Sequence, residues 1–236
     1  MSFISCLMVT RGGLWPARQS IAAFQRQSHA ARELVVVSPL ADDPIAAFVR
    51  ETGDPTIRHI ASGNGTLGER RNIAVAHSRG DIVATWDDDD LHHRDRLARQ
   101  WDAMRHDGHA ACFIARLLLW WPVRQRLMVT HRRPWEGSMV AHRAVVPIMP
   151  ALDREEDMRA VSAMLALRPA TMLDWPAGYA YVVHGGNTNA ADHFDRMCSF
   201  SQSVEHRDGY EGALAALQGE HDFAGYADAL AASPRP

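Results

Sequence analysis

Four consecutive aspartates, Asp87–Asp90, lie between the apolar run Ile82–Trp86 and a segment of helical character. Adjacent carboxylates repel each other, so a chain that gathers them at a strand end usually offsets their charge with a cation. Side chains alternate along a pleated strand, which sends Asp87 and Asp89 to one side and Asp88 to the other. Two carboxylates with this spacing can share one Mg²⁺ or Mn²⁺ ion, with phosphate oxygens completing its shell. The run therefore predicts a divalent-metal site in an α/β enzyme that handles phosphates.

Asp90 has a plainer interpretation, because Asp immediately before a helix is a good N-cap. We expect it to cap a helix whose apolar face carries Leu97, Trp101 and Met104. The same explanation fails for the other three aspartates, since a strand end offers too few donors to satisfy them. We therefore favour metal binding over a solvated acidic turn.

A glycine-rich segment, residues 62–72, lies one strand before the aspartates. Its three glycines precede a helix start, where free backbone N–H groups can receive an anion. The pair Arg71 and Asn72 in the first helical turn strengthens this otherwise weak signal. All 25 basic residues are arginine, which excludes Schiff-base chemistry and a Walker-type loop because both need lysine. Phosphate contacts must come from arginine, backbone N–H groups or metal.

The composition is that of a globular protein with 47% hydrophobic and 22% charged residues. A net charge of −3 argues against a general nucleic-acid or anionic-membrane binder. Cys6, Cys112 and Cys198 have no metal or redox spacing, and we interpret them as core residues. No stretch reaches the roughly 18 apolar residues of a spanning helix. We expect a cytoplasmic, bacterial protein, with a peripheral position at the inner face of the membrane as the alternative.

Strands and helices alternate through the first half of the sequence, which predicts right-handed crossovers and a mainly parallel sheet. We expect strands at Phe3–Val9, Leu34–Val37, Thr56–Ile60 and Ile82–Trp86, and helices at Pro16–Gln27, Pro44–Thr52 and Leu67–His77. The rhythm changes after Ala110. There we expect strands at Ala111–Leu119, Arg126–His131, Ser138–His142, Thr171–Trp175 and Tyr179–Val183, a helix at Arg154–Leu167, and helical structure from Gln202.

Four motifs in order resemble the family-2 glycosyltransferases. The series Gly68-x-x-Arg71-Asn72, an apolar strand and then Asp87–Asp90 is similar to the core of that family. The segments Ile4–Arg11 and Gln25–Val37 resemble its first strand, first helix and second strand. Glu156–Asp157 resembles its catalytic acidic pair, and His184–Thr188 the histidine turn that closes over its metal. The resemblance spans roughly residues 3–194, and the ordered series is far more specific than any single motif.

The resemblance implies a GT-A fold, an α/β three-layer sandwich with a mainly parallel central sheet and a mixed C-terminal half. We expect one domain over residues 1–236, with a nucleotide-binding half (1–109), an acceptor-binding and catalytic half (110–200) and a C-terminal helical tail (201–236). The resemblance also implies that the enzyme transfers a sugar from a nucleotide-sugar with inversion of configuration, and that a UDP-sugar is the favoured donor. The implied cofactor is Mn²⁺ or Mg²⁺. The acceptor would be a glycan, a lipid-linked molecule or a small molecule.

Carried over by position, the resemblance makes Asp157 the base, with Glu156 as the alternative. The metal ligands would be Asp89, Asp87 and His184. One position departs from the family, which usually places a base-reading Asp where this chain has Ser38. The implied donor contacts are Thr10, Arg11, Ser38, Gly68, Arg71, Asn72, Asp87 and Asp88.

Plainer alternatives remain open for these residues. The acidic residues within 153–156 have the pattern of a capping box. Acids in a first helical turn stabilise the helix whether or not they take part in catalysis. His184 can be an ordinary histidine at a strand end. Two other functions also compete. A nucleotidyltransferase would need a basic glycine-rich loop, of which Thr10–Leu14 is a poor version, and a non-catalytic nucleotide-sugar or Ca²⁺ module would make the acidic pair coincidental.

Overall fold

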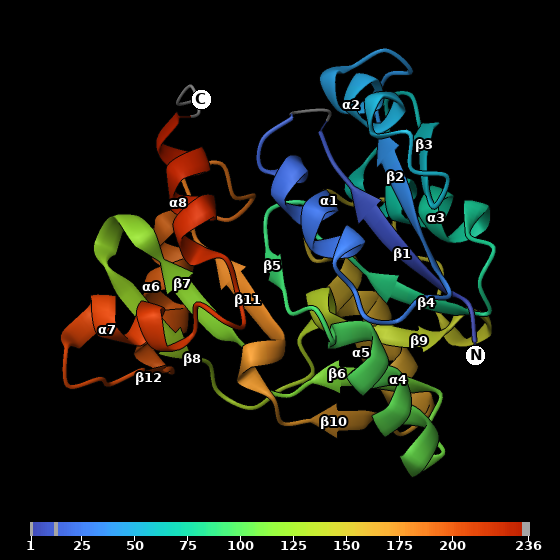
Figure 1. Cartoon of the computed structure of the whole chain (residues 1–236). Coiled ribbons are helices and arrows are strands. Elements are labelled where there is room, and N and C mark those ends of the chain that lie inside the picture. The colour runs from blue at the N-terminus through green and yellow to red at the C-terminus, as the bar shows by residue number, and fades with distance from the viewer. Residues whose placement is uncertain (1, 12–13, 233–236) are drawn as a thin grey trace.

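The computed structural model describes residues 2–11 and 14–232, which form an α/β architecture with two sheets (Figure 1). The larger sheet has seven described strands in the order β10-β6-β9-β4-β1-β2-β3. Of these, β9 alone is antiparallel to its neighbours, β4 and β6. The strands are β1 (Ile4–Val9), β2 (Arg32–Ser38), β3 (Ile57–Ala61), β4 (Ile82–Thr85), β6 (Ala111–Ile114), β9 (Val140–His142) and β10 (Thr171–Leu173).

Helices cover both faces of this sheet and so make three layers. One face packs against α1, α2 and α4, and the other packs against α3 and α5. The division follows the alternation along β1, where Ile4, Cys6 and Met8 face the first group and Leu7 faces the second. The helices are α1 (Ala17–Gln25), α2 (Pro44–Thr52), α3 (Leu67–His77), α4 (Arg96–Asp107) and α5 (Glu156–Leu167).

A second, mixed sheet has the strand order β12-β8-β7-β11-β5. Helix α6 packs on one face through Phe194 and Cys198, and α7 and α8 pack on the other through Ala213, Phe223 and Tyr226. No helix in the described residues is long and apolar enough to cross a membrane. The elements are β5 (Leu91–His92), β7 (Leu118–Trp121), β8 (Arg126–Val129), β11 (Tyr179–Val182), β12 (Gln202–Ser203), α6 (Ala191–Ser199), α7 (Gly209–Ala216) and α8 (Phe223–Ala232).

The first half follows the sequence prediction closely, and α2 and α3 have the predicted bounds. Asp43 caps α2 by accepting a hydrogen bond from Ala46 N, and Gly53 ends it in the left-handed conformation with φ of 60°. Local signals of this kind need no information from distant residues. The predicted fold class, a three-layer α/β sandwich with a mainly parallel sheet, is confirmed.

Two element predictions for the second half are wrong. The expected strand Ala111–Leu119 is divided between the two sheets, because β6 ends at Ile114 and β7 begins at Leu118. Both strands are buried, and the single charged residue Arg116 is the sequence's mark of the point where the chain changes sheet. Helical structure also starts earlier than expected, with α6 at Ala191, and the expected helical stretch from Gln202 opens with a short strand.

Candidate active site

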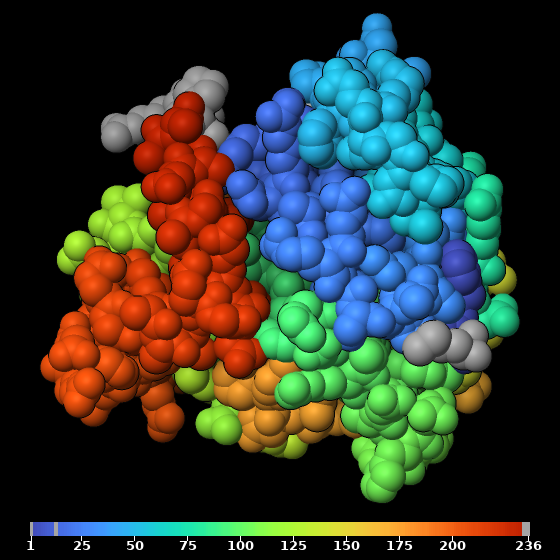
Figure 2. Space-filling model, in the orientation of Figure 1, coloured from blue at the N-terminus to red at the C-terminus, as the bar shows by residue number. Residues whose placement is uncertain are grey.

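A cleft of about 1840 Å³ opens where the two sheets meet. β1 and β4 are parallel neighbours, so the segments that follow them, Val9–Arg11 and Asp87–Asp90, lie together at its floor. The starts of α3 and α5 and the turn after β11 form the walls. Helix α8 closes one side through Ala227 and Leu230, so the expected C-terminal tail is part of the site. Figure 2 shows this helix, in red, packed beside the N-terminal part of the chain, in blue.

The aspartate turn is held firmly at its first residue, Asp87. Its backbone oxygen accepts hydrogen bonds from Ser20 Oγ (2.8 Å) and His92 Nε2 (3.3 Å). Its side chain accepts from Arg71 Nη2 at 3.3 Å and from the Tyr179 hydroxyl at 2.9 Å. Both carboxylate oxygens therefore have protein partners.

The prediction that Asp90 caps a helix is wrong. The strand β5 follows it directly, and α4 begins only at Arg96. Asp90 is buried, where its Oδ1 accepts from Val182 N at 2.8 Å and its Oδ2 is hydrogen-bonded to the Tyr179 hydroxyl. These bonds tie the turn to β11. Because Tyr179 has one hydroxyl proton for two carboxylates, we assign a proton to Asp90, consistent with burial raising its pKa.

The carboxylates of Asp87–Asp90 lie close together in an environment that is largely shielded from water. Burial raises the pKa of Asp87, and it raises the pKa of Asp88 to about 7, with the charge of Asp89 acting in the same direction on both. A hydrogen bond from Thr10 partly opposes the effect at Asp88. The turn is therefore a place where a bound cation would relieve repulsion.

Asp89 and His184 form a pair at the cleft. Their Oδ2 and Nε2 atoms are 3.0 Å apart, and Asn187 Nδ2 lies 3.3 Å from the same oxygen. Gly186 N donates to His184 Nδ1, so the neutral imidazole carries its hydrogen on Nε2 and donates it to Asp89. The ring edge of Trp15 packs on His184 with centroids 5.7 Å apart. His184 is thus a histidine with partners at both ring nitrogens, and its binding of a metal stays a prediction.

The residues at the aspartate turn offer few ligands for the expected Mn²⁺ or Mg²⁺ ion. Within the described ranges, no three His, Cys, Asp or Glu side chains are grouped as ligands of one ion. Asp87 and Asp89 have different hydrogen-bond partners, and their sharing of one ion stays a prediction. A magnesium-type site needs only one or two carboxylates when substrate phosphates and water supply the other ligands. Asp89 fits an ion that binds together with a diphosphate, and His184 can join it as a ligand once the hydrogen on Nε2 is displaced.

The acidic pair at the start of α5 is divided by burial. The Glu156 side chain is only 2% exposed and accepts from Arg71 Nε at 3.0 Å. Asp157 is 30% exposed, lines the cleft and has its Oδ2 3.9 Å from Arg71 Nη2. Burial alone would lower the pKa of Arg71, but the carboxylates of Asp87, Asp157 and Glu156 raise it overall. Arg71 is thus a permanent cation that joins the aspartate turn to α5.

The capping box expected at residues 153–156 is not formed. Glu155 precedes α5 with φ of 63° and makes no side-chain cap. Asp153 instead accepts a hydrogen bond from Leu67 N at the start of α3, at 3.0 Å. The capping box of this region belongs to α3 and is formed between Thr66 and Glu69. The starts of α3 and α5 share one packed corner.

Three predicted donor contacts do not line the cleft. Ser38 is buried and donates to Asp43 Oδ2 at 2.6 Å. Asn72 donates to Met149 O and accepts from Met149 N, both at 2.9 Å. Gly68 packs so closely that a Cβ there would lie 1.9 Å from a backbone oxygen of the loop before α5. The last two position that loop instead of contacting the cleft.

The cleft is lined by Thr10, Arg11, Arg71, Asp87 and Asp88, and their contact with a donor stays a prediction. Arg11 Nη2 donates to a hydroxyl of the His184 turn, Thr188 Oγ1, at 3.2 Å. The loop Thr10–Leu14 weighed for a nucleotidyltransferase includes residues 12 and 13, which lie outside the described residues.

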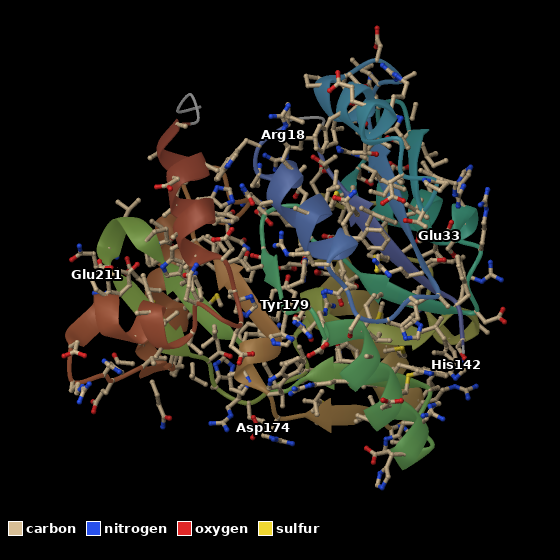
Figure 3. The ribbon with its side chains drawn as sticks, in the orientation of Figure 1. Arg18, Glu33, His142, Asp174, Tyr179 and Glu211 are labelled. Carbon is tan, nitrogen blue, oxygen red and sulfur yellow. The ribbon has the colours of Figure 1, made fainter. Side chains whose placement is uncertain are left out.

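Four further residues of the cleft region were not predicted. Tyr179 lies fully buried at the aspartate turn, near the centre of the molecule (Figure 3). Tyr226 of α8 donates to Asp89 O at 2.6 Å. Glu136 pairs with Arg133, and Trp15 has a buried indole N–H without a partner among the described residues. No motif or spacing in the surrounding sequence marks these residues as part of the site. Each either contacts residues more than 70 positions away or lies in a segment without a recognisable pattern.

This two-sheet architecture, with its acidic cleft at the carboxyl ends of the strands, defines a GT-A glycosyltransferase fold. Residues 7–132 match the family model described as Glycosyl transferase family 2, which is more than half of the chain. The chain therefore belongs to glycosyltransferase family 2, and the resemblance seen in the sequence is confirmed. Membership of this family disfavours the nucleotidyltransferase alternative.

Solved structures share the fold at low sequence identity. S. aureus TarS 1–349 in complex with UDP-GlcNAc has a TM-score of 0.61 and 15% identity, covering 78% of this chain and 60% of that one. The mannosyltransferase PcManGT from Pyrobaculum calidifontis, in complex with GDP-Man and Mn²⁺, has a TM-score of 0.61 and 14% identity, covering 100% of this chain and 77% of that one. The chain thus spans about 60% of the length of TarS 1–349. No curated protein sequence matches it significantly.

Proposed function

We propose that this protein transfers a sugar from a nucleotide-sugar to an acceptor hydroxyl, with inversion at the anomeric carbon. The observation that carries the proposal is the bridge made by Arg71, which contacts both Asp87 of the aspartate turn and the two acids of α5. It brings a cation-ready turn and an exposed carboxylate to one cleft. The structures of TarS with UDP-GlcNAc and PcManGT with GDP-Man support a nucleotide-sugar donor. We favour a UDP-sugar.

Asp89 and His184 would hold a Mn²⁺ or Mg²⁺ ion, which when bound neutralises charge on the leaving diphosphate. Thr10, Arg11 and Asp88 line the same end of the cleft and would contact the donor. Asp87 contributes less directly, because its oxygens already accept from Arg71 and Tyr179. Its role is to fix the turn from which Asp88 and Asp89 extend.

Asp157 acts as the base in this proposal. The acceptor oxygen attacks the anomeric carbon and its proton passes to Asp157, while the bond from that carbon to the diphosphate oxygen breaks. One displacement of this kind inverts the configuration and needs no covalent intermediate. Glu156 is unsuited to the same task, because it is buried against Arg71 and does not face an incoming hydroxyl as freely.

A donor screen with Mn²⁺ tests the proposal. Purified protein is incubated with UDP- and GDP-sugars and a panel of glycan, lipid-linked and small-molecule acceptors, and release of nucleoside diphosphate is measured. We expect acceptor-dependent release that Asp89→Asn abolishes, with an inverted anomeric configuration in the product by NMR. Retention of configuration would contradict the inverting mechanism. Tight donor binding without turnover on any acceptor would favour the non-catalytic binding module.

A further inference from the structure

The two ends of the aspartate turn are joined by one side chain from a distant strand. The Tyr179 hydroxyl donates to Asp87 Oδ2 at 2.9 Å and is hydrogen-bonded to Asp90 Oδ2 as well. Asp88 and Asp89 form the tip of the turn between these two points, and both line the cleft. The hydroxyl therefore sets the distance between the ends and, through it, the direction of the tip.

Tyr179 is itself held rigidly. It is the first residue of β11 and pairs in register with His92 of β5, whose ring packs edge-on against it at 5.0 Å. The guanidinium of Arg96 lies 5.1 Å from the centre of the tyrosine ring. Arg96 is in turn fully buried and donates to the Thr85 and Gly137 carbonyls. Packing on these sides pre-organises the hydroxyl.

Gly137 packs directly against the hydrogen bond between Asp87 and Tyr179. A Cβ placed on Gly137 would lie 2.5 Å from Asp87 Oδ2 and 2.8 Å from the Tyr179 hydroxyl. Neither atom has room to retreat, because each is already hydrogen-bonded to a buried partner. The chain thus keeps the smallest residue beside the Asp87–Tyr179 bond, where even a methyl group would separate the pair.

An ordinary core tyrosine needs a single partner for its hydroxyl, and any nearby carbonyl would serve. The partners here are the two carboxylates that bound the turn. We propose that Tyr179 is a positioning residue that fixes the aspartate turn so that Asp88 and Asp89 face the donor diphosphate and its cation. This role rests on the proposed function and deepens it, because it assigns the geometry of the ion site to a fully buried residue that acts through the aspartates it binds.

The test removes the hydroxyl and keeps the ring, with Tyr179→Phe. Its matched control is Tyr210→Phe, which removes a hydroxyl that accepts a hydrogen bond from Trp120 Nε1 and does not line the cleft. Calorimetry measures UDP binding with Mn²⁺ and without it, and electron paramagnetic resonance measures Mn²⁺ binding alone. We expect Tyr179→Phe to weaken Mn²⁺-dependent binding by about 10- to 100-fold, the usual effect of losing a partner that orients a metal ligand. The control should bind as the wild type does.

A purely structural role would lower the melting temperature of Tyr179→Phe and leave Mn²⁺-dependent affinity unchanged, which would overturn the inference while the proposed function stands. If the wild type shows no Mn²⁺-dependent nucleotide binding, the proposed function fails and this role fails with it. Should Tyr179→Phe not fold, a crystal structure of the wild type with Mn²⁺ and UDP decides. The inference requires the hydroxyl to stay within hydrogen-bond distance of Asp87 and Asp90, and its displacement from either would overturn it.

Discussion

At the scale of single residues, burial separates acids that the sequence presents as equivalent. Glu156 and Asp157 are neighbours at the start of α5, yet one is enclosed against Arg71 and the other is open to the cleft. The favourable interaction of acids with a helix N-terminus applies to both. Access to a substrate hydroxyl is greater at Asp157, whose side chain is 30% exposed against 2% for Glu156. The geometry therefore favours the first of the two base candidates proposed from the sequence.

Asp157→Asn is expected to reduce sugar transfer by roughly 10²-fold or more, the usual scale for losing a positioned proton acceptor. Donor and Mn²⁺ binding should stay near normal, because Asp157 lies on α5 and not on the aspartate turn. Steady-state kinetics together with calorimetry of donor binding check both parts. Glu156→Gln serves as the comparison, and we expect it to lower thermal stability more than Asp157→Asn does. A stable Asp157→Asn variant with near-normal transfer would leave that residue only a helix-terminus role.

The adjacent residues Arg70 and Arg71 make a second comparison. The sequence places Arg71 at the nucleotide, but its three carboxylate partners favour an internal role. Arg70 also lines the cleft, and among residues 2–11 and 14–232 its guanidinium donates only to the carbonyl oxygens of Gly65 and Thr10. Within the described residues no carboxylate lies within ion-pair distance of it.

We expect Arg71→Ala to cost roughly 3 kcal/mol of folding stability, because it leaves buried carboxylates without their cation. Arg70→Ala should change stability less and weaken nucleoside diphosphate binding by about 1.5–3 kcal/mol, the value of a charge-assisted contact. Urea denaturation and calorimetry measure the two effects. Normal stability in Arg71→Ala with lost nucleotide affinity would restore the assignment made from the sequence.

The sequence could predict the residues whose chemistry is local. The aspartate run was found from residue type and spacing, and the acidic pair and the histidine turn were found from the family resemblance; all three motifs contribute residues to the lining of the cleft. Their partners could not be found in this way. Tyr179 is 92 positions from Asp87, and its sequence context is only that of an apolar strand. Asn72 looked like a donor contact because its polar group could not be assigned to Met149 without the fold.

At the scale of helices and strands, local signals were reliable where an element begins and ends on its own residues. Helix α5 differs from α2 and α3, because no side chain caps its start. Asp153, which looked like its cap, serves α3 instead. The corner between α3 and α5 is packed backbone to backbone at Gly68, whose N donates to Leu152 O at 2.9 Å.

Gly68→Ala is therefore expected to destabilise the protein by roughly 1–3 kcal/mol or more, because overpacking here meets a backbone oxygen that cannot move aside. Gly65→Ala is the matched control. Its Cβ would come no closer than 3.3 Å to any atom beyond its chain neighbours, the nearest being in the Glu69 carboxylate, so the overlap is far smaller than at Gly68. Thermal unfolding of both variants measures the difference. Equal stabilities would show that the corner between α3 and α5 can relax.

At the scale of the whole molecule, the C-terminal segment completes the cleft and is not an appendage. Tyr226 bonds to the aspartate turn, and His93 Nε2 lies 2.6 Å from Glu220 in the segment between α7 and α8. His221 is buried beside them, with its Nε2 2.8 Å from Ala177 O before β11. Sequence patterns showed that this segment is helical, but they could not show that it packs on the site, because its partners come from both sheets.

Docking of this segment should depend on pH through His221. Burial lowers the pKa of its imidazole to about 4, so the folded state binds its proton more weakly than the unfolded chain, where the pKa is near 6.5. The contribution of the neutral His221 imidazole to the free energy of unfolding is fully present above about pH 6.5 and is lost as the pH falls toward about 4. The loss between pH 6.5 and 5 is about 2 kcal/mol. Asp88, whose pKa is raised to about 7, acts in the opposite direction, so the difference between wild type and His221→Gln is the quantity to measure. Urea denaturation should show His221→Gln gaining about 2 kcal/mol on the wild type when the pH drops from 7.5 to 5. The control His106→Gln, at an exposed histidine of α4, should show no such gain, and a pH-independent difference for His221→Gln would contradict the burial of a neutral imidazole at this joint.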